Sequence, residues 1–167
     1  MNWLVLVAAV LHQVLAAWTA SAAAPARLAV FDLELIDSSL QGEMEGIDPA
    51  DQARLRMIEA ELRQRLEESG RFVLVDTAPV ADQIDAAGVL WSCNGCELGI
   101  ARRLDAELSL VGWVQKVSNL ILNLNVVIRD TTTREQVFAS SVDIRGNTDE
   151  SWQHGIRYLL KNRLLKD

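Results

Sequence analysis

The sequence predicts one α/β sandwich domain with a mixed sheet of about five strands, in the order β-α-β-α-α-β-β-β-α. In the first half, apolar runs of strand length alternate with helical patterns, which is typical of folds that contain parallel strands. In the second half, three alternating runs follow one another and indicate a C-terminal antiparallel meander. An amphipathic helical pattern ends the chain, and we expect the helices to pack mainly on one side of the sheet.

The N-terminus has the pattern of a secretory signal peptide. The run MNWLVLVAAVL is apolar, the first charged side chain is Arg27, and a tract of small residues precedes it. We expect a signal peptide over residues 1–24, cleaved after Ala22 or Ala24, and a single domain over residues 25–167. The leader lacks a Lys or Arg, so an uncleaved anchor is the alternative. The mature protein is therefore expected in the periplasm, with no membrane span after cleavage.

The charge of the chain excludes one class of function. The formal net charge is −7, and all of it lies after the leader. Binding to nucleic acid depends largely on cationic side chains that neutralise phosphates, so we expect no nucleic-acid partner. A mature chain of about 145 residues can bury a sizeable core without a disulfide framework.

In the first half, the clearest element is a helix that begins at Asp48. This residue can act as the N-cap, Pro49 suits the first helical position, and Gly70 suits the position after the helix. The buried stripe of this helix is expected to be Leu55, Ile58, Leu62 and Leu66. Residues 27–37 before it are expected to form a central strand, because they are apolar on both faces near their start.

The middle of the chain is expected to form a strand and two helices. Residues 71–76 form a short apolar run, residues 78–88 have Pro near the first turn and Gly at the end, and a further helix follows to about Leu104.

Three strands and the last helix complete the pattern. The strands are expected over residues 107–117, 120–130 and 136–146, the first two joined by a turn at Ser118-Asn119. One face of the middle strand is wholly apolar: Leu120, Leu122, Leu124, Val126 and Ile128. In the last helix, the buried stripe is Trp152, Ile156, Leu159, Leu160 and Leu164.

The segment IARRLDAELSLVGWVQKVSNLILNLNVVIRDTTTREQVFASSVDI resembles a pattern of bacterial envelope proteins. It is similar to the α/β domains of the TolB N-terminus, curli-secretion lipoproteins and penicillin-binding-protein activator lipoproteins. Gly112 matches a mid-strand glycine, and Asp130 with Thr133 matches an Asp-x-x-Thr-Gly turn. Residues 104–107, Leu-Asp-Ala-Glu, replace Leu-Gly-Ala-Asp, and Arg134 replaces the turn glycine.

The segment CNGCELGIARRL also resembles a family of small secreted bacterial proteins of unknown function. Together, these resemblances imply an adapter or binding domain whose partner is another envelope protein.

No complete catalytic constellation is present in the sequence. His154 is the only histidine after the leader, and the chain has neither a G-x-S-x-G elbow nor a phosphate-binding glycine loop. We therefore expect no catalytic residues, no cofactor and no small-molecule substrate, with His154 on a helix surface.

The acidic loop Asp37–Asp48 is the weak candidate for a metal site. Asp37, Glu45 and Asp48 fall at positions 1, 9 and 12 of an EF-hand-like calcium loop. Ser39 and Gln41 stand where that loop has acidic or amide ligands, so a solvated acidic loop is the favoured interpretation.

Polar side chains on the last two strands are the candidate interaction face. The alternation places one set on the side opposite the apolar face: Asn123, Asn125, Arg129, Ser141, Asp143 and Arg145. If no helix covers that side, it offers a hydrogen-bonding surface to a partner protein. The alternative is that it has no function, because antiparallel sheets often expose one face to solvent.

Cys93 and Cys96 are the only cysteines of the chain. Glu97 excludes haem attachment, which requires histidine after the second cysteine, and a zinc site would need further ligands. A thiol pair at a helix start can be redox-active. In an oxidising compartment, a local disulfide that fixes the turn is favoured, with Gly95 relieving backbone crowding. Our first functional hypothesis is a non-enzymatic periplasmic adapter, and the alternative is a thiol–disulfide or metal-handling protein that uses this pair.

Overall fold

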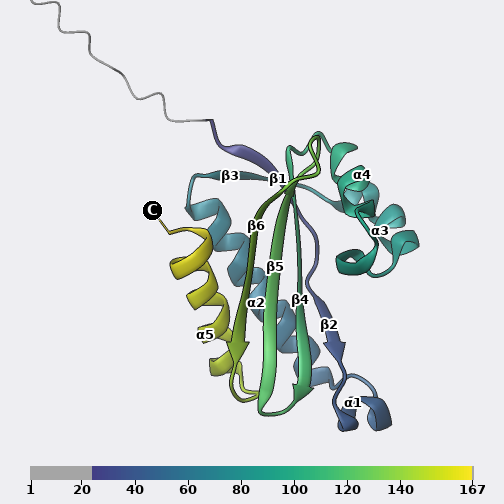
Figure 1. The fold of residues 1–167 in the computed structure, drawn as a ribbon, viewed down its shortest axis with the longest axis vertical. Helices are drawn as coiled ribbons and strands as arrows, with labels where there is room; N and C mark the ends of the chain where they lie inside the picture. Colours follow the sequence, from purple (N-terminus) through teal and green to yellow (C-terminus); the bar gives the residue numbers. More distant parts are fainter. Residues whose placement is uncertain (1–23, 167) are drawn as a thin grey trace, which may run out of the picture.

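Six strands form one mixed sheet in a computed structural model that describes residues 24–166 (Figure 1). The strands are β1 (Ala26–Val30), β2 (Glu34–Asp37), β3 (Phe72–Val75), β4 (Leu108–Ser118), β5 (Ile121–Asp130) and β6 (Gln136–Ile144). Their order is β3-β1-β4-β5-β6, with β2 also paired to β4. Strand β1 lies parallel to β3 and β4, while β4, β5 and β6 form the antiparallel meander. The predicted fold class is confirmed; the expected signal peptide lies, apart from Ala24, outside the described residues.

Five α-helices are present in residues 24–166, four of them between strands and the last after β6. They are α1 (Leu40–Glu45), α2 (Pro49–Glu68), α3 (Ala81–Ala87), α4 (Cys96–Arg102) and α5 (Asp149–Leu159), with short 3-10 turns η1 (Ala78–Val80) and η2 (Leu90–Ser92) and a π-helical end η3 (Leu160–Leu164). The predicted cap of α2 is present, because Asp48 Oδ1 accepts a hydrogen bond from Ala50 N–H at 2.8 Å. In the chain from residue 24 to 166, we find no helix with the length and apolar character that crossing a membrane requires.

Three local expectations need correction. The expected strand over 27–37 is divided into β1 and β2, because one extra residue is accommodated between the pairs Val30–Leu110 and Glu34–Trp113. The loop after β2 contains α1, which Ser39 caps by accepting from Gly42 N–H at 3.1 Å. Leu120 was expected on the apolar face of β5, but it precedes the strand and is 75% exposed.

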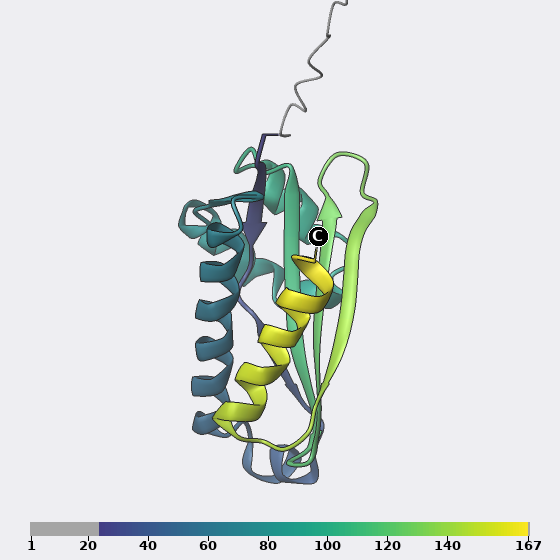
Figure 2. The same cartoon turned by 90° about the vertical axis from the view of Figure 1, so that its left-hand side faces the viewer.

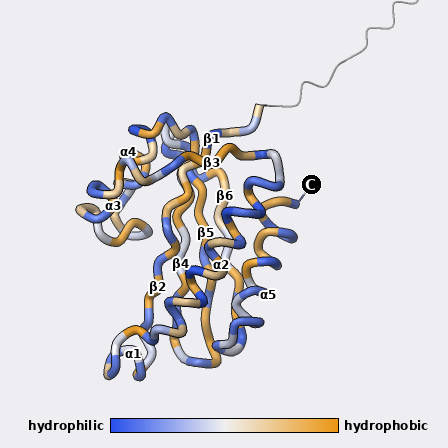
Figure 3. The backbone as a smooth tube through the Cα atoms, turned by 180° about the vertical axis from the view of Figure 1, so that it is seen from behind, coloured by the Kyte–Doolittle hydropathy of each residue, from blue (hydrophilic) through white to orange (hydrophobic). Residues whose placement is uncertain are grey.

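The main core lies between the sheet and the two long helices. Helices α2 and α5 cover one face, and every residue of the two predicted stripes is buried there (Figure 2). A smaller cluster forms on the opposite face, where η1, η2 and α4 pack over β1 and the adjoining part of β4. Apolar and polar residues alternate along the strands in the view from behind (Figure 3), as expected for a sheet that buries one face fully and the other in part.

The two positions that depart from the glycines of the resembled pattern both adopt left-handed backbone conformations. Asp105 has φ 54° and Arg134 has φ 67°, a region that favours glycine. The side chain of Asp105 is exposed, and its backbone carbonyl accepts the bond from Arg27 Nε at 2.8 Å.

Replacing Asp105 with glycine is expected to raise the free energy of unfolding by about 0.5–1 kcal/mol, because it relieves the left-handed strain of a side chain. Urea denaturation of the domain over residues 25–167 measures the change. Asp105→Ala keeps the Cβ atom and is expected to give no gain. A glycine variant no more stable than the alanine variant would show that this backbone position carries no strain.

Candidate functional site

The side of the sheet opposite α2 and α5, here called the outer face, is only partly covered. Helix α4 and the turn η2 lie at one end of it, against Val111 of β4 and Val127 of β5. Beyond them, toward the β4–β5 turn, no helix lies over β5 and β6 among the described elements (Figure 1). The cross-strand register brings Asn125 of β5 opposite Ser141 of β6 on this open part. A surface of this kind is available to a partner.

The candidate polar side chains on this open part form one hydrogen-bonded cluster. Asn123 Nδ2 donates to Asp143 Oδ1 at 2.9 Å, and Ser141 Oγ donates to Asn123 Oδ1 at 2.7 Å. Asn125 Nδ2 donates to the carbonyl oxygen of Asn123 at 3.3 Å. Ser141 and Asp143 are exposed, while the two asparagines are half-buried. The structure therefore brings together four of the six residues that the alternation indicated.

The two arginines of the candidate face do not join this cluster. Arg129 Nη1 donates instead to Glu97 Oε1 of α4 at 3.0 Å, because α4 reaches this part of β5. Arg145 is exposed but follows the last residue of β6, so it lies outside the strand that was expected to carry it.

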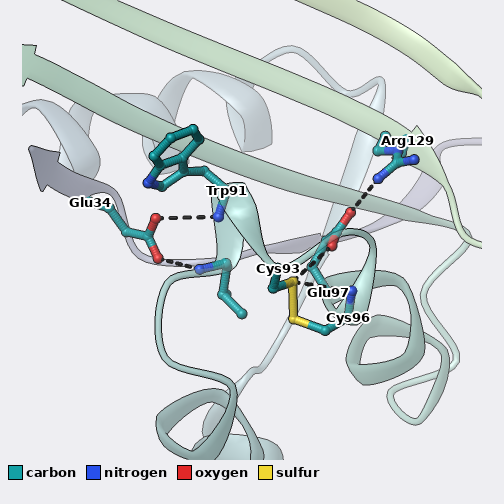
Figure 4. Close-up of a disulfide and its surroundings, with 7 residues drawn as sticks. Glu34, Trp91, Cys93, Cys96, Glu97 and Arg129 are labelled. Atoms are coloured by element: carbon teal, nitrogen blue, oxygen red, sulfur yellow. Dashed lines mark hydrogen bonds and ion pairs between the residues drawn. A yellow bond between two sulfur atoms is a disulfide. The ribbon is translucent and has the colours of Figure 1, made fainter.

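The cysteine pair forms a disulfide at the start of α4 (Figure 4). Cys93 and Cys96 are joined at an S–S distance of 2.01 Å. The N–H of Cys96 donates to Cys93 Sγ at 3.1 Å. Asn94 and Gly95 between them have φ values of 58° and 95°. This turn reverses the chain through two left-handed residues, which asparagine and glycine tolerate best.

A buried carboxylate lies beside the disulfide. Glu97 Oε2 is 3.4 Å from Cys93 Sγ, and the other carboxylate oxygen of Glu97 accepts a hydrogen bond from Arg129 (Figure 4). Its side chain is 3% exposed. If the pair were reduced, this carboxylate would oppose a second negative charge on Cys93, although Arg129 offsets part of that effect.

The same three residues form a potential metal-ligand group in the described part of the chain. Ligand atoms of Cys93, Cys96 and Glu97 lie within 4.8 Å of one another. Metals bind thiolates, and a closed disulfide supplies none, so the oxidised pair is a poor ligand set. A fourth protein ligand is missing from this group.

An aromatic pair beside the disulfide has no signal in the sequence pattern. Trp91 of η2 stacks on Trp113 of β4 with 5.1 Å between ring centroids and 27° between the ring planes. The carboxylate of Glu34 orients η2 by accepting from the N–H groups of Leu90 and Trp91 at 2.6 and 3.3 Å (Figure 4). Only the tertiary contact between η2 and β4 reveals this pair.

The stacked rings line one end of a groove of about 390 Å³ on the outer face. Residues from η2, the cysteine turn and the three strands of the meander form its walls, and Arg129 is one of them. Trp91 is 40% exposed, so this indole offers apolar surface to a bound molecule. Exposed tryptophans in concave surfaces are frequent anchors of protein interfaces.

The structure does not assemble the three carboxylates of the acidic loop into a site. Asp48 is engaged as the cap of α2, and Glu45 Oε2 accepts from Gln41 on α1 at 3.1 Å. Asp37 turns into the protein, where its second oxygen lies 3.1 Å from Lys116 Nζ. In residues 24–166 they are not among the groups whose ligand atoms approach one another.

Lys116 instead connects two buried aspartates. Lys116 Nζ donates to Asp51 Oδ2 at 2.6 Å and pairs with Asp37. Burial alone would raise the pKa of Asp51, but hydrogen bonds from Lys116 and Asn147 outweigh it and hold that pKa below its usual value. Burial would lower the pKa of Lys116, yet its bonds to the two carboxylates raise it. This ion cluster joins β2, α2 and β4 and has a structural role.

Replacing Cys93 and Cys96 with serine is expected to leave the fold intact. The disulfide closes a loop with a sequence separation of 3, for which the chain-entropy model gives a loss on the order of 2 kcal/mol in the free energy of unfolding. Circular dichroism and urea denaturation test this. A loss above about 3 kcal/mol, or an unfolded variant, would show that the disulfide does more than fix a local turn.

The fold and site together define a small α/β domain with a partly open sheet face and, among the described residues, no assembled catalytic or metal centre. The family model DUF3280, described as "Protein of unknown function (DUF2380)", matches residues 26–164. The chain belongs to this family. Comparison with curated protein sequences gives no match.

Solved structures share the fold. The LpoB C-terminal domain from Salmonella enterica is 19% identical, with a TM-score of 0.50 over 75% of this chain and 87% of that one. The LpoB C-terminal domain from Escherichia coli is 17% identical, with a TM-score of 0.50 over 74% and 85%. Lipoprotein GNA1162 from Neisseria meningitidis is 15% identical, with a TM-score of 0.48 over 75% and 84%. The expected membership in a family of unknown function with this α/β fold is confirmed.

Proposed function

We propose that this protein is a non-enzymatic periplasmic adapter that binds another envelope protein through its outer face. The observation that carries the proposal is the open part of that face, where a polar cluster borders a groove lined by a stacked tryptophan pair, of which Trp91 is exposed. Aromatic anchors surrounded by hydrogen-bonding side chains are typical of protein interfaces. Export by the N-terminal leader would place this face in the periplasm.

Two features of the site support binding over chemistry. The polar side chains of the cluster bond to one another, so none of them is a positioned nucleophile beside a base. His154, the only histidine after the leader, is exposed on α5, and no described residue donates to it or accepts from it within a catalytic arrangement.

Affinity purification from the periplasm after crosslinking, with identification by mass spectrometry, tests the proposal. The matched pair of variants is Ala139→Arg/Ser141→Arg on the outer face and Ala53→Arg/Ala60→Arg on the exposed side of α2. Both add the same charge at exposed positions. We expect one envelope protein to be recovered with the natural protein and the α2 variant, and to fall by at least about tenfold with the outer-face variant. No partner above background, or equal recovery with both variants, would contradict the proposal.

Thiol–disulfide exchange is the second candidate, because Cys93 and Cys96 are half-buried beside the open groove. The carboxylate of Glu97 next to Cys93 Sγ opposes it. An insulin-reduction assay distinguishes the two candidates, with the serine double variant as control. Turnover that depends on both cysteines would support exchange. Two free thiols in denatured, unreduced protein taken from the periplasm would contradict the disulfide itself.

A further inference from the structure

One end of the molecule, here called the tip, exposes a cluster of large apolar side chains. The tip consists of the segment around α1 and the β4–β5 turn, which lie together at the lower end of Figure 1. Its apolar side chains are Leu40, Met44, Ile47, Val117, Leu120 and Ile121. Residues 24–166 expose eleven large apolar side chains, and six of them belong to the tip. Such clustering marks an interaction surface, whereas single exposed apolar residues do not.

Hydrogen bonds hold the two segments of the tip against each other. The N–H and hydroxyl of Ser38 both donate to the carbonyl oxygen of Lys116, at 2.9 and 3.2 Å. Asn119 Nδ2 in the turn donates to Gln41 Oε1 on α1 at 3.3 Å. The two segments that carry the apolar side chains are therefore fixed relative to each other. Met44 is 77% exposed and Leu120 is 75% exposed.

The charge of the tip is acidic and unbalanced. Residues 38–50 contain Glu43, Glu45 and Asp48 and no Lys or Arg, while residues 117–121 carry no charge. The nearest cation on β4, Lys116, is buried and paired with Asp37 and Asp51, so it does not offset this charge. The exposed Arg145 lies next to the turn, where Gly146 N–H donates to the carbonyl oxygen of Leu120 at 3.3 Å, and it offsets only part of the acidic charge. A partner must therefore match both apolar surface and negative charge.

We propose that the tip docks an amphipathic segment of a partner protein, in which Lys or Arg residues flank an apolar face. A second copy of this chain would bring two acidic tips together, and an anionic lipid surface would repel the tip, so charge favours neither. A basic amphipathic helix supplies both the apolar contact and the opposite charge. This second surface goes beyond the outer-face proposal and does not depend on it.

Fluorescence anisotropy with a labelled helical peptide of about 18 residues tests the tip directly. The probe carries leucines at helical spacing and lysines elsewhere, and a scrambled peptide of the same composition serves as its control. We expect the mature protein to bind the amphipathic peptide at least about tenfold more tightly than the scrambled one. The variant Met44→Ser/Leu120→Ser/Ile121→Ser should lose that difference.

Matched variants make the result specific. Val73→Ser/Val137→Ser removes exposed apolar side chains elsewhere and should leave peptide affinity unchanged. Glu43→Gln/Glu45→Gln should weaken binding at low salt and much less at high salt. Circular dichroism verifies that each variant is folded.

Three outcomes would overturn the proposal. Equal affinity of the natural protein and the tip variant for the amphipathic peptide would show that the tip does not bind it. Binding to phosphatidylglycerol vesicles that the tip variant abolishes would identify a lipid surface as the occupant. A dimer in sedimentation equilibrium that the tip variant dissociates would identify a second copy.

Discussion

Replacing Lys116 with methionine is expected to lower the free energy of unfolding by about 3–5 kcal/mol. The side chains of Lys116, Asp37 and Asp51 are 1%, 2% and 0% exposed. Methionine fills similar volume but leaves the buried carboxylate of Asp37 without a cation and leaves Asp51 with Arg54 alone, at 2.8 Å. The cost arises from that uncompensated charge and not from loss of the ion pair as such. Urea denaturation at neutral pH measures the change.

The pH dependence of this variant provides its control. In the natural protein, the pKa values of Asp37 and Asp51 are lowered, so their stabilising contribution is present above the ordinary aspartate pKa of about 3.9 and is lost as the pH falls below it. Without Lys116, the pKa values of both aspartates should rise above those in the natural protein, although Arg54 still pairs with Asp51, and the variant should gain stability relative to the natural protein as the pH falls. The two stability curves should therefore converge at acidic pH.

A second control removes the charges together. Asp37→Asn/Asp51→Asn/Lys116→Met leaves no buried charge in the cluster and should recover part of the lost stability at neutral pH. A Lys116→Met variant whose deficit is the same at every pH would show that lost packing, and not buried charge, is responsible.

Replacing Gly112 with valine is expected to lower the free energy of unfolding by about 3 kcal/mol, the upper end for an overpacked core. A Cβ atom at Gly112 would lie 2.6 Å from Leu33 Cδ2 and 3.0 Å from the carbonyl oxygen of Asn125. Leu33 is buried in the main core, and Asn125 belongs to the neighbouring strand β5, so neither can withdraw freely. Thermal and urea denaturation measure the loss.

Gly99 is the matched control for this substitution. It lies inside α4, and a Cβ atom there would meet nothing within 4 Å. Gly99→Ala should therefore stabilise the domain by about 0.5–1 kcal/mol through helix propensity. A Gly112→Val variant as stable as the natural protein would contradict the close approach of β1–β2 to β4 at this point.

Local patterns were sufficient to predict most of the fold. The stripe of α2, its cap at Asp48 and the meander depend on neighbours within a few residues, and these predictions are confirmed. The disulfide was also predictable, because Cys93 and Cys96 lie close in sequence with Asn-Gly between them. The division of the first strand was not, since it depends on its pairing with β4.

The buried ion cluster and the aromatic pair were missed for the same reason. Lys116 lies near the end of β4, where a charged residue is usually solvent-exposed, and its partner Asp51 lies 65 residues away. Trp91 and Trp113 belong to separate elements that meet only through the contact between η2 and β4. In each case no periodicity within one segment signals the contact, so the sequence pattern alone favours the solvent-exposed interpretation.

Site-specific photocrosslinking in living cells tests the adapter proposal most directly. A photoreactive benzoylphenylalanine is introduced in place of Ser141 on the outer face and, separately, in place of Ala60 on the exposed side of α2. We expect an adduct between the Ser141 variant and one envelope protein, and no such adduct from the Ala60 variant. The absence of an adduct at Ser141, or the same adduct from both positions, would contradict binding through the outer face.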